Sequence, residues 1–358
     1  MINEITRKNL LKLADYRGEL YKSPKLRFLF FELTDKCNLN CAHCGSNCNL
    51  LKDNKLEIEI IEKTLDEVAS KYDSKNIMIC LTGGEPMLYN DVYEVIWQSK
   101  KLGFAVGMTS NGTLIDEKSA ILLAKSGLDT ISISIDGLER THDNFRNCKG
   151  SYKKAMKGIK YLQNVGIEPQ VTTVVNKTNI NELDDLFKIM QKEEICSWRI
   201  TNVDPIGRAR VNKELLLDKN ELIKVFNFIK DKRFDNANDI EVTYGCAHFV
   251  AYDYEKFIRD FYFQCEAGVR VASVAANGDI VACLDIERRK DLVQGNIYKD
   301  NFIDIWENKY EAFKQDWSDK SETCKKCEHK KVCMGDSAHT WDYDNNEPLY
   351  CVKKFEEA

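Results

Sequence analysis

The sequence has no apolar run long enough to cross a membrane, and the segment from Met1 to Leu20 carries scattered charges where a signal peptide has an apolar centre. Basic residues are not in excess either. The chain has 52 lysines and arginines against 57 acidic residues, a net charge of -5, which argues against a general nucleic-acid-binding surface. Internal repeats and low-complexity segments are also missing. These absences predict a cytoplasmic protein with neither a membrane nor a nucleic acid as partner.

Cysteine, by contrast, is abundant, with 14 residues in the chain. Disulfides do not explain this number, because the reducing pool of the cytoplasm disfavours them. One group of cysteines lies between residues 37 and 48 and another between residues 246 and 351, and clustered spacing of this kind points to metal binding. Cys80, Cys148 and Cys196 lie apart from both groups, and we expect them to be small buried hydrophobic residues.

At 358 residues the chain is longer than a single core usually grows, so we expect one large domain and a small one. Short apolar runs alternate with amphipathic stretches from residue 28 onward. Six strands that are each followed by a helix predict a parallel α/β sheet, either closed as a barrel or open. The expected strands are 28–33, 77–81, 105–109, 130–135, 170–175 and 198–203, and the expected helices are 60–72, 92–102, 117–126, 152–165 and 183–192.

The alternation of strands and helices stops after about residue 215. One more helix, near 220–232, leads into the cysteine-rich part of the chain. We therefore expect three parts: an N-terminal extension over residues 1–24, an α/β domain over 25–240 and a small cysteine-rich domain over 241–358.

Unusual residues follow the first four expected strands. Cys37 comes after the first strand, Gly-Gly-Glu-Pro at 83–86 after the second, Ser-Asn-Gly at 110–112 after the third and Asp-Gly at 136–137 after the fourth. The carboxyl ends of parallel strands lie at one edge of the sheet, where α/β proteins place their active sites. These residues are therefore expected on one rim.

Three cysteines, Cys37, Cys41 and Cys44, lie in one short loop. Three thiolates can hold three corners of a 4Fe-4S cluster and leave its fourth iron open to another ligand. A structural zinc site is the alternative, but it normally closes with a fourth ligand, which His43 or Cys48 could supply. The loop by itself leaves both interpretations open.

The cysteine loop after the first strand and the Gly-Gly-Glu-Pro segment after the second together resemble the radical S-adenosylmethionine superfamily. The resemblance implies a partial (β/α)6 barrel of the TIM type, a 4Fe-4S cluster on the three cysteines and S-adenosylmethionine (SAM) chelated to the open iron. It also implies reductive cleavage of SAM to a 5′-deoxyadenosyl radical, which abstracts hydrogen from a substrate. In the Gly-Gly-Glu-Pro segment, the glycines would let backbone carbonyls approach the methionine ammonium, and Glu85 would complement its charge or order the loop.

Other rim residues match the family pattern. Ser134 could bond a hydroxyl of SAM and Arg146 its carboxylate, although a turn residue or a surface salt bridge is the alternative for each. Arg208 either holds its own loop or faces the substrate. The expected cofactor-binding residues are Gly83, Gly84, Glu85, Pro86, Ser110, Asn111, Ser134, Arg146 and Asn176.

The C-terminal cysteines resemble the SPASM extension of peptide and enzyme maturases, whose members hold two auxiliary iron-sulfur clusters. The resemblance assigns an outer cluster to Cys324, Cys327, Cys333 and Cys351, with a zinc knuckle as the alternative for the first two. Where the family commonly has a further cysteine, this chain has Ser337. The inner cluster would then have an open iron, a non-thiolate ligand or fewer irons. Its candidate ligands are Cys246, Cys265 and Cys283, with His248, Asp336 and His339 as possible substitutes.

The resemblance implies an enzyme that modifies a peptide or protein side chain. In sulfatase-maturing members an aspartate base follows the cysteine equivalent to Cys283; here Leu284 stands there and Asp285 one place later, either as catalytic base or as a surface residue. The same extension occurs in haem-pathway and antibiotic-pathway enzymes, so a tetrapyrrole or another small metabolite is the alternative substrate. An iron-sulfur redox carrier is a third interpretation, but a carrier has no use for the amino-acid pocket.

Two partners follow from this interpretation. A reductant such as flavodoxin or ferredoxin would supply the electron for SAM cleavage. Only about 25 residues precede the first strand, far fewer than a leader-binding domain needs. A peptide substrate would therefore require a separate leader-binding protein.

Overall fold

The computed structural model describes residues 4–235, 237–245, 248–250 and 252–351. Its main element is a ten-stranded sheet in the order β10-β9-β8-β1-β2-β3-β4-β5-β6-β7. Every neighbouring pair from β8 through β1 to β7 is parallel, whereas β9 and β10 are antiparallel additions at one edge. The strands are β1 (Phe28–Glu32), β2 (Met78–Thr82), β3 (Ala105–Ser110), β4 (Thr130–Ser134), β5 (Pro169–Val175), β6 (Ser197–Asn202), β7 (Glu241–Tyr244), β8 (Val271–Val274), β9 (Asp279–Val281) and β10 (Gly295–Asn296).

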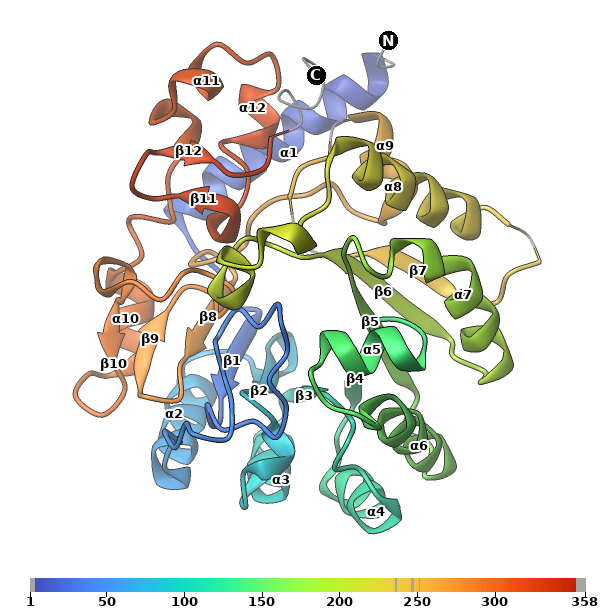
Figure 1. Cartoon of the computed structure of the whole chain (residues 1–358). Coiled ribbons are helices and arrows are strands. Elements are labelled where there is room, and N and C mark those ends of the chain that lie inside the picture. Colours follow the sequence, from blue (N-terminus) through green and yellow to red (C-terminus); the bar gives the residue numbers. More distant parts are fainter. Residues whose placement is uncertain (1–3, 236, 246–247, 251, 352–358) are drawn as a thin grey trace.

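Helices cover the convex side of the curved sheet, as Figure 1 shows. The expected alternation is confirmed, and two of these helices begin at capping boxes formed by Asp116 with Ser119 and by Asp218 with Glu221. The helices of the barrel part are α2 (Ile58–Lys71), α3 (Val92–Lys101), α4 (Glu117–Ser126), α5 (Glu139–Phe145), α6 (Ser151–Asn164), α7 (Leu183–Lys192) and α8 (Lys219–Arg233). Those of the C-terminal part are α9 (Tyr252–Ile258), α10 (Phe302–Asn308), α11 (Glu322–Lys325) and α12 (Lys330–Cys333), next to the hairpin β11 (Trp341–Asp342) and β12 (Glu347–Pro348).

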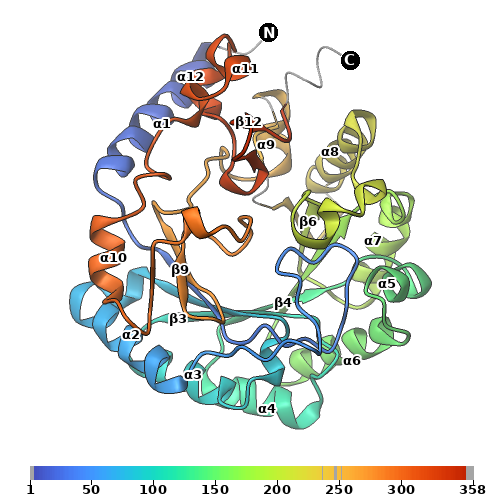
Figure 2. The same cartoon turned by 60° about the vertical axis from the view of Figure 1, so that its left-hand side comes forward.

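The two faces of the sheet differ in burial. On β4, Ile131 and Ile133 are fully buried under helices, whereas Ser132 and Ser134 on the other face are only half-buried. β5 alternates in the same way. A parallel sheet covered on both faces would be apolar on both. On β4 and β5 the concave face is therefore less buried and carries hydroxyl groups, and in Figure 2 the loop after β1 crosses in front of it.

The expected boundary at residue 240 lies inside this continuous sheet. β7 continues the parallel order beyond that residue, and β8 from the C-terminal part pairs with β1 in the register Phe28 to Val271. One buried cluster of side chains also extends from Leu26 to Tyr350. The N-terminal residues form helix α1 (Glu4–Lys22), which packs on α12. The division into 1–24, 25–240 and 241–358 stays a prediction.

Cysteines outside the two groups differ from expectation. Cys196 is exposed, while Cys80 and Cys148 are half-buried, so none of them is a fully buried core residue. Cys148 packs against the cysteine loop, a placement that its isolated position in the sequence does not reveal. Within the described part of the chain, no helix combines the length and the apolar character that crossing a membrane requires.

Candidate functional site

The loop after β1 gathers its cysteines in one small cluster. Cys37 and Cys41 are buried, Cys44 is half-buried, and all three pack together with Leu39. The backbone N–H of Leu39 donates to the Cys37 sulfur (3.4 Å), and the N–H of Cys48 donates to the Cys44 sulfur (3.4 Å). Burial raises the pKa of the Cys37 thiol to about 12, so its thiolate needs a cation beside it, as a metal-binding cysteine does.

The Gly-Gly-Glu-Pro segment is joined to the cysteine loop by its backbone. The N–H of Gly84 donates to the carbonyl of Thr34 (2.6 Å), and the N–H of Glu85 donates to the carbonyl of Lys36 (2.9 Å). A side chain at Gly83 would overlap Thr34, and one at Gly84 would overlap the Lys36 carbonyl oxygen. The glycines are needed because two backbones approach this closely, directly before Cys37.

Glu85 connects the second and third rim segments. Its fully buried carboxylate accepts hydrogen bonds from the Ser110 hydroxyl (2.7 Å), the Asn111 N–H (2.8 Å) and the Met87 N–H (3.1 Å). Burial raises the pKa of Glu85 above its usual value, and these hydrogen bonds oppose the rise. These hydrogen bonds order the loop, and a contact of Glu85 with the methionine ammonium stays a prediction. Asn111 then reaches toward the cysteines, with its amide bonded to Asn38 (2.9 Å) and 4.0 Å from the Cys37 sulfur.

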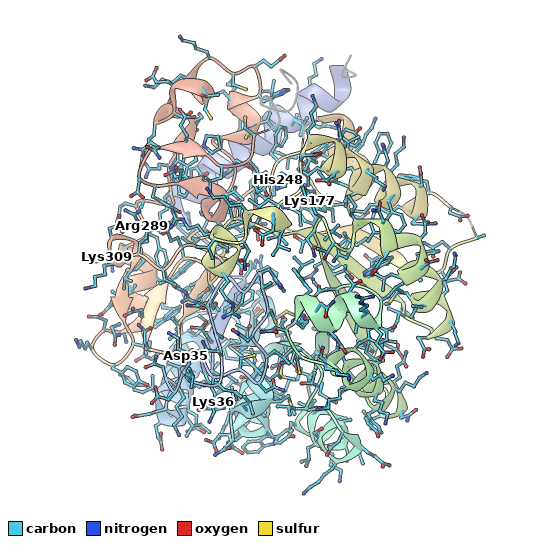
Figure 3. The ribbon with its side chains drawn as sticks, in the orientation of Figure 1. Asp35, Lys36, Lys177, His248, Arg289 and Lys309 are labelled. Carbon is cyan, nitrogen blue, oxygen red and sulfur yellow. The ribbon has the colours of Figure 1, made fainter. Side chains whose placement is uncertain are left out.

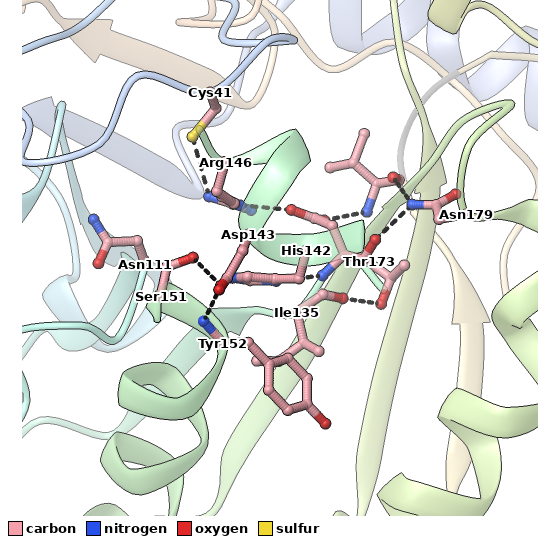
Figure 4. Close-up of polar contacts among 12 residues, drawn as sticks. Cys41, Asn111, Ile135, His142, Asp143, Arg146, Ser151, Tyr152, Thr173 and Asn179 are labelled. Carbon is pink, nitrogen blue, oxygen red and sulfur yellow. Dashed lines mark hydrogen bonds and ion pairs between the residues drawn. The ribbon is translucent and has the colours of Figure 1, made fainter. Parts of the chain in front are cut away.

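Arg146 lies between the cysteine loop and the end of β4 (Figure 4). Its Nε donates to Asp136 (2.6 Å), and its Nη1 lies 3.8 Å from the Cys41 sulfur. Burial disfavours the charged guanidinium, but Asp136 and Cys41 together outweigh it and raise the pKa of Arg146. Burial likewise opposes the charge on Asp136, and Arg146 holds the pKa of that carboxyl below its usual value. The alternative of a surface salt bridge is therefore wrong, because both partners are buried.

Other residues also hold Asp136 in its ion pair with Arg146. The second carboxylate oxygen of Asp136 accepts from the N–H of Val174 (2.8 Å), and the backbone N–H of Asp136 donates to Nδ1 of His142 (3.0 Å). Figure 4 shows how the side chain of Asp143 fixes the turn into α6 through Ser151 and Tyr152. Burial lowers the pKa of His142 to about 4, so this histidine is neutral at pH 7.

Replacing Arg146 with glutamine is expected to destabilise the fold by about 3–5 kcal/mol, because Asp136 would keep a buried, unpaired charge. Thermal or urea unfolding of the anaerobic protein measures this loss. Arg140→Gln removes the same charge from an exposed position of the same helix and should change stability by less than about 0.5 kcal/mol. Equal effects of the two substitutions would contradict the role of the buried pair.

The loop after β6 holds the cysteine loop from the other side. Nε of Arg208 donates to the carbonyl of Cys41 (2.6 Å), and its Nη1 donates to the carbonyl of Cys48 (3.0 Å). Asn212 donates to the carbonyl of Ala42 (2.8 Å), and a side chain at Gly207 would overlap the carbonyls of Cys44 and Gly45. Arg208 therefore holds a loop, which is one of its two expected roles. The loop that it holds is the cysteine loop and not its own.

Three other expected cofactor-binding residues are less prominent. Asn176 is fully buried, and its side-chain oxygen accepts from the N–H (2.8 Å) and hydroxyl (2.6 Å) of Thr178, so it orders its own turn. Ser134 is half-buried at the end of β4. Pro86 begins a short turn after the glycines. Contacts of these residues to SAM stay predictions.

The C-terminal cysteines also converge. Cys324, Cys327, Cys333 and Cys351 all line one cavity, together with Phe249 and Tyr350. Among the described residues, no three His, Cys, Asp or Glu side chains are placed to hold a single metal ion, but the thiolates of a cubane each bind a different iron and need not meet at one point. Both cysteine groups offer thiolate sulfurs, which are the donor atoms that iron-sulfur clusters require.

The inner group is less complete. Cys246 lies outside the described residues, and Cys265 and Cys283 are half-buried. Ser337 is fully buried and bonds the hydroxyl of Thr340 (2.7 Å). Of the possible substitutes, His339 pairs with Asp204 at the end of β6 (3.3 Å), His248 stacks on Tyr350, and Asp336 accepts from the N–H of Phe249 (2.7 Å). The nature of an inner cluster stays a prediction.

Asp285, the expected base, is exposed, and Leu284 beside it is buried. Burial lowers the pKa of His339, but the negative charges of Asp204, Asp285 and Asp336 together outweigh it and raise that pKa above its usual value. The catalytic role of Asp285 stays a prediction, and sequence reasoning missed Asp204 because no motif contains it.

Residues 31–190 match the model of the radical SAM superfamily, and residues 265–328 match SPASM, an iron-sulfur cluster-binding domain. The AdoMet-dependent heme synthase of Nitratidesulfovibrio vulgaris is 30% identical over 354 residues, which cover 92% of this chain and 94% of the relative. The PqqA peptide cyclase of Rhizobium meliloti is 27% identical over 311 residues, which cover 85% and 80%. Streptococcus suis SuiB bound to precursor peptide SuiA has the same fold, with a TM-score of 0.71 at 19% identity over 90% of this chain and 74% of that one. The chain belongs to the radical SAM superfamily and carries a SPASM domain after its partial barrel.

Proposed function

We propose that this radical SAM enzyme acts on a tetrapyrrole. The observation that carries the proposal is the match to a heme synthase, because its 30% identity extends over nearly the whole of both chains. The match to a peptide cyclase covers less of each chain at lower identity. The barrel and the SPASM domain are both included in the match to the heme synthase, so the likeness is not confined to the part that cleaves SAM.

The cofactors of the enzyme are SAM, a 4Fe-4S cluster and auxiliary iron-sulfur clusters. We assign the first cluster to Cys37, Cys41 and Cys44. When bound, it supplies the electron that cleaves SAM to methionine and a 5′-deoxyadenosyl radical. The protein's own contribution is positional: Gly84 and Arg208 fix the loop backbone, and Arg146 places a positive charge beside the Cys41 sulfur.

A groove of about 360 Å³ lies beside the cysteine loop. Ser46 of that loop, Cys283 and the basic run 288–290 line it, and so do the acidic residues Glu32, Asp35, Asp279 and Glu287. Arg288 already pairs with Glu32 (2.9 Å), and Arg289, labelled in Figure 3, pairs with Asp344 (2.6 Å). Lys290 is exposed beside them. Lys290 would bind a propionate group of a tetrapyrrole, because lysine binds carboxylates directly, whereas Arg288 and Arg289 would first have to exchange their acidic partners.

The test is anaerobic turnover of the reconstituted protein with dithionite, SAM and iron coproporphyrin III, a tetrapyrrole with carboxylate side chains. We expect 5′-deoxyadenosine to form faster with the tetrapyrrole than without it, and mass spectrometry to show a tetrapyrrole product of altered mass. If the tetrapyrrole changed neither the rate of deoxyadenosine formation nor its own mass, the proposed substrate would be wrong. The assignment of SAM cleavage would not be affected.

A peptide or protein substrate is the second candidate, since a relative that is 27% identical is a peptide cyclase. Turnover with short peptides encoded beside the gene distinguishes the two, because only the true substrate should change in mass. The reductant, such as flavodoxin or ferredoxin, and a separate leader-binding protein stay predictions.

A further inference from the structure

Helix α1 brings a buried arginine to the cysteines of the C-terminal domain. Both views show α1 lying along α12 (Figures 1 and 2). Arg17 on α1 is only 5% exposed. Its Nη1 donates to the backbone carbonyl of Cys333 (3.4 Å), and its guanidinium lies over the ring of Tyr21, 5.6 Å from the centroid. Arg17 also lines a small cavity with Cys265.

This guanidinium has few partners for a buried charge. Its Nε is buried and has no hydrogen-bond partner among the described residues, and within that part of the chain it forms no ion pair with a carboxylate. Asp336 lines the same cavity and accepts from the N–H of Phe249 (2.7 Å), but it does not come within ion-pair distance of Arg17. A buried cation without a counter-ion is costly. A further negative charge at this place would stabilise it.

Two cysteines lie at this place: Cys265 lines the cavity of Arg17, and the carbonyl of Cys333 accepts from its Nη1. Their thiolates can carry such a charge. Cys333 is one of the four cysteines that line a single cavity. An iron-sulfur cluster held by four thiolates has a net negative charge, and reduction adds one more. A buried cation nearby therefore stabilises the reduced state more than the oxidised state.

We propose that Arg17 raises the reduction potential of the auxiliary cluster held by Cys324, Cys327, Cys333 and Cys351. This inference depends on the proposed auxiliary cluster, but not on the identity of the substrate. In the reaction, the substrate radical would lose one electron and this cluster would gain it. Arg17 would favour that transfer as a positioning residue, without contact to the substrate. The N-terminal helix would thus take part in electron acceptance as well as in packing.

The experiment uses the full chain with Cys37, Cys41 and Cys44 replaced by alanine, so that only auxiliary clusters remain after anaerobic reconstitution. Redox titration followed by electron paramagnetic resonance compares this parent with versions carrying Arg17→Gln, Arg17→Lys or Lys22→Gln. We expect a more negative midpoint potential for Arg17→Gln, a smaller shift for Arg17→Lys and no shift for Lys22→Gln, which removes an exposed charge from the same helix.

Iron and sulfide counts accompany each titration and separate the outcomes. Equal iron content with the same midpoint potential in Arg17→Gln and the parent would overturn the role of Arg17 and leave the cluster assignment intact. A lower melting temperature for Arg17→Gln without a shift in potential would likewise overturn it, because Arg17 would then only anchor α1. If the parent chain without Cys37, Cys41 and Cys44 bound no iron, both the cluster assignment and the role of Arg17 would be wrong. This outcome is independent of the turnover test with the tetrapyrrole.

Discussion

Replacing Cys41 with alanine should reduce the formation of 5′-deoxyadenosine from SAM by more than about 100-fold. Loss of a group that only supports a metal ligand already costs about 10- to 100-fold, and Cys41 is proposed as a ligand itself. Its sulfur also faces Arg146 at 3.8 Å, so the substitution leaves that cation without its sulfur partner. Chromatography of an anaerobic reaction with dithionite measures the product, and iron analysis should show a loss of about four irons per chain.

Cys196→Ala is the matched control, since Cys196 is exposed and lies at the beginning of β6, away from both cysteine groups. It should leave the iron content and the rate unchanged. If the Cys41 variant kept its rate of deoxyadenosine formation, the assignment of the SAM-cleaving site would be wrong. If it lost its rate but kept all its iron, the cysteine would serve the reaction in some way other than as a ligand.

Replacing Gly84 with alanine should cost at least about 100-fold in the same reaction. The added methyl group would overlap the carbonyl oxygen of Lys36, so the backbone directly before Cys37 must move. A displacement of about 1 Å at an active site can cost about 100-fold in rate. Overpacking of this kind should also lower the free energy of unfolding by about 1–3 kcal/mol, which urea unfolding measures.

The control for this substitution is Gly18→Ala in helix α1, where a side chain would meet nothing within 4 Å. Alanine there should stabilise the chain by about 0.5–1 kcal/mol, because glycine is unfavourable within a helix, and should not alter the rate. A Gly84 variant with unchanged activity and stability would show that the two backbones do not approach as closely as the structure indicates.

Much of the fold could be predicted from local patterns. The six expected strands all form, each within about a residue or two of its expected limits, because apolar runs and amphipathic periods are local properties of the chain. β7, β8, β9 and β10 are not predicted, since strands such as Glu241–Tyr244 and Val271–Val274 are too short to give a pattern and depend on pairing with distant strands.

The site shows the same division between local and distant information. The cysteine loop and the Gly-Gly-Glu-Pro segment were found because each is a continuous motif. Asp136 was noted only as part of a turn, yet it forms the buried ion pair with Arg146. Asn212 and Arg17 carried no signal, since an asparagine or an arginine acquires its role only from the carbonyl beside it in the fold.

The sequence by itself determined the alternation of strands and helices along the chain, the rim on which the motifs meet and the donor groups available for iron, because these follow from periodicity and from side-chain chemistry. Only the tertiary structure decided what holds those donors in place. Glu85 orders two rim segments, Arg208 binds the carbonyls of the cysteine loop, and Arg17 approaches the C-terminal cysteines from the other end of the chain. These roles depend on contacts between residues far apart in sequence, and such contacts exist only once the chain has folded.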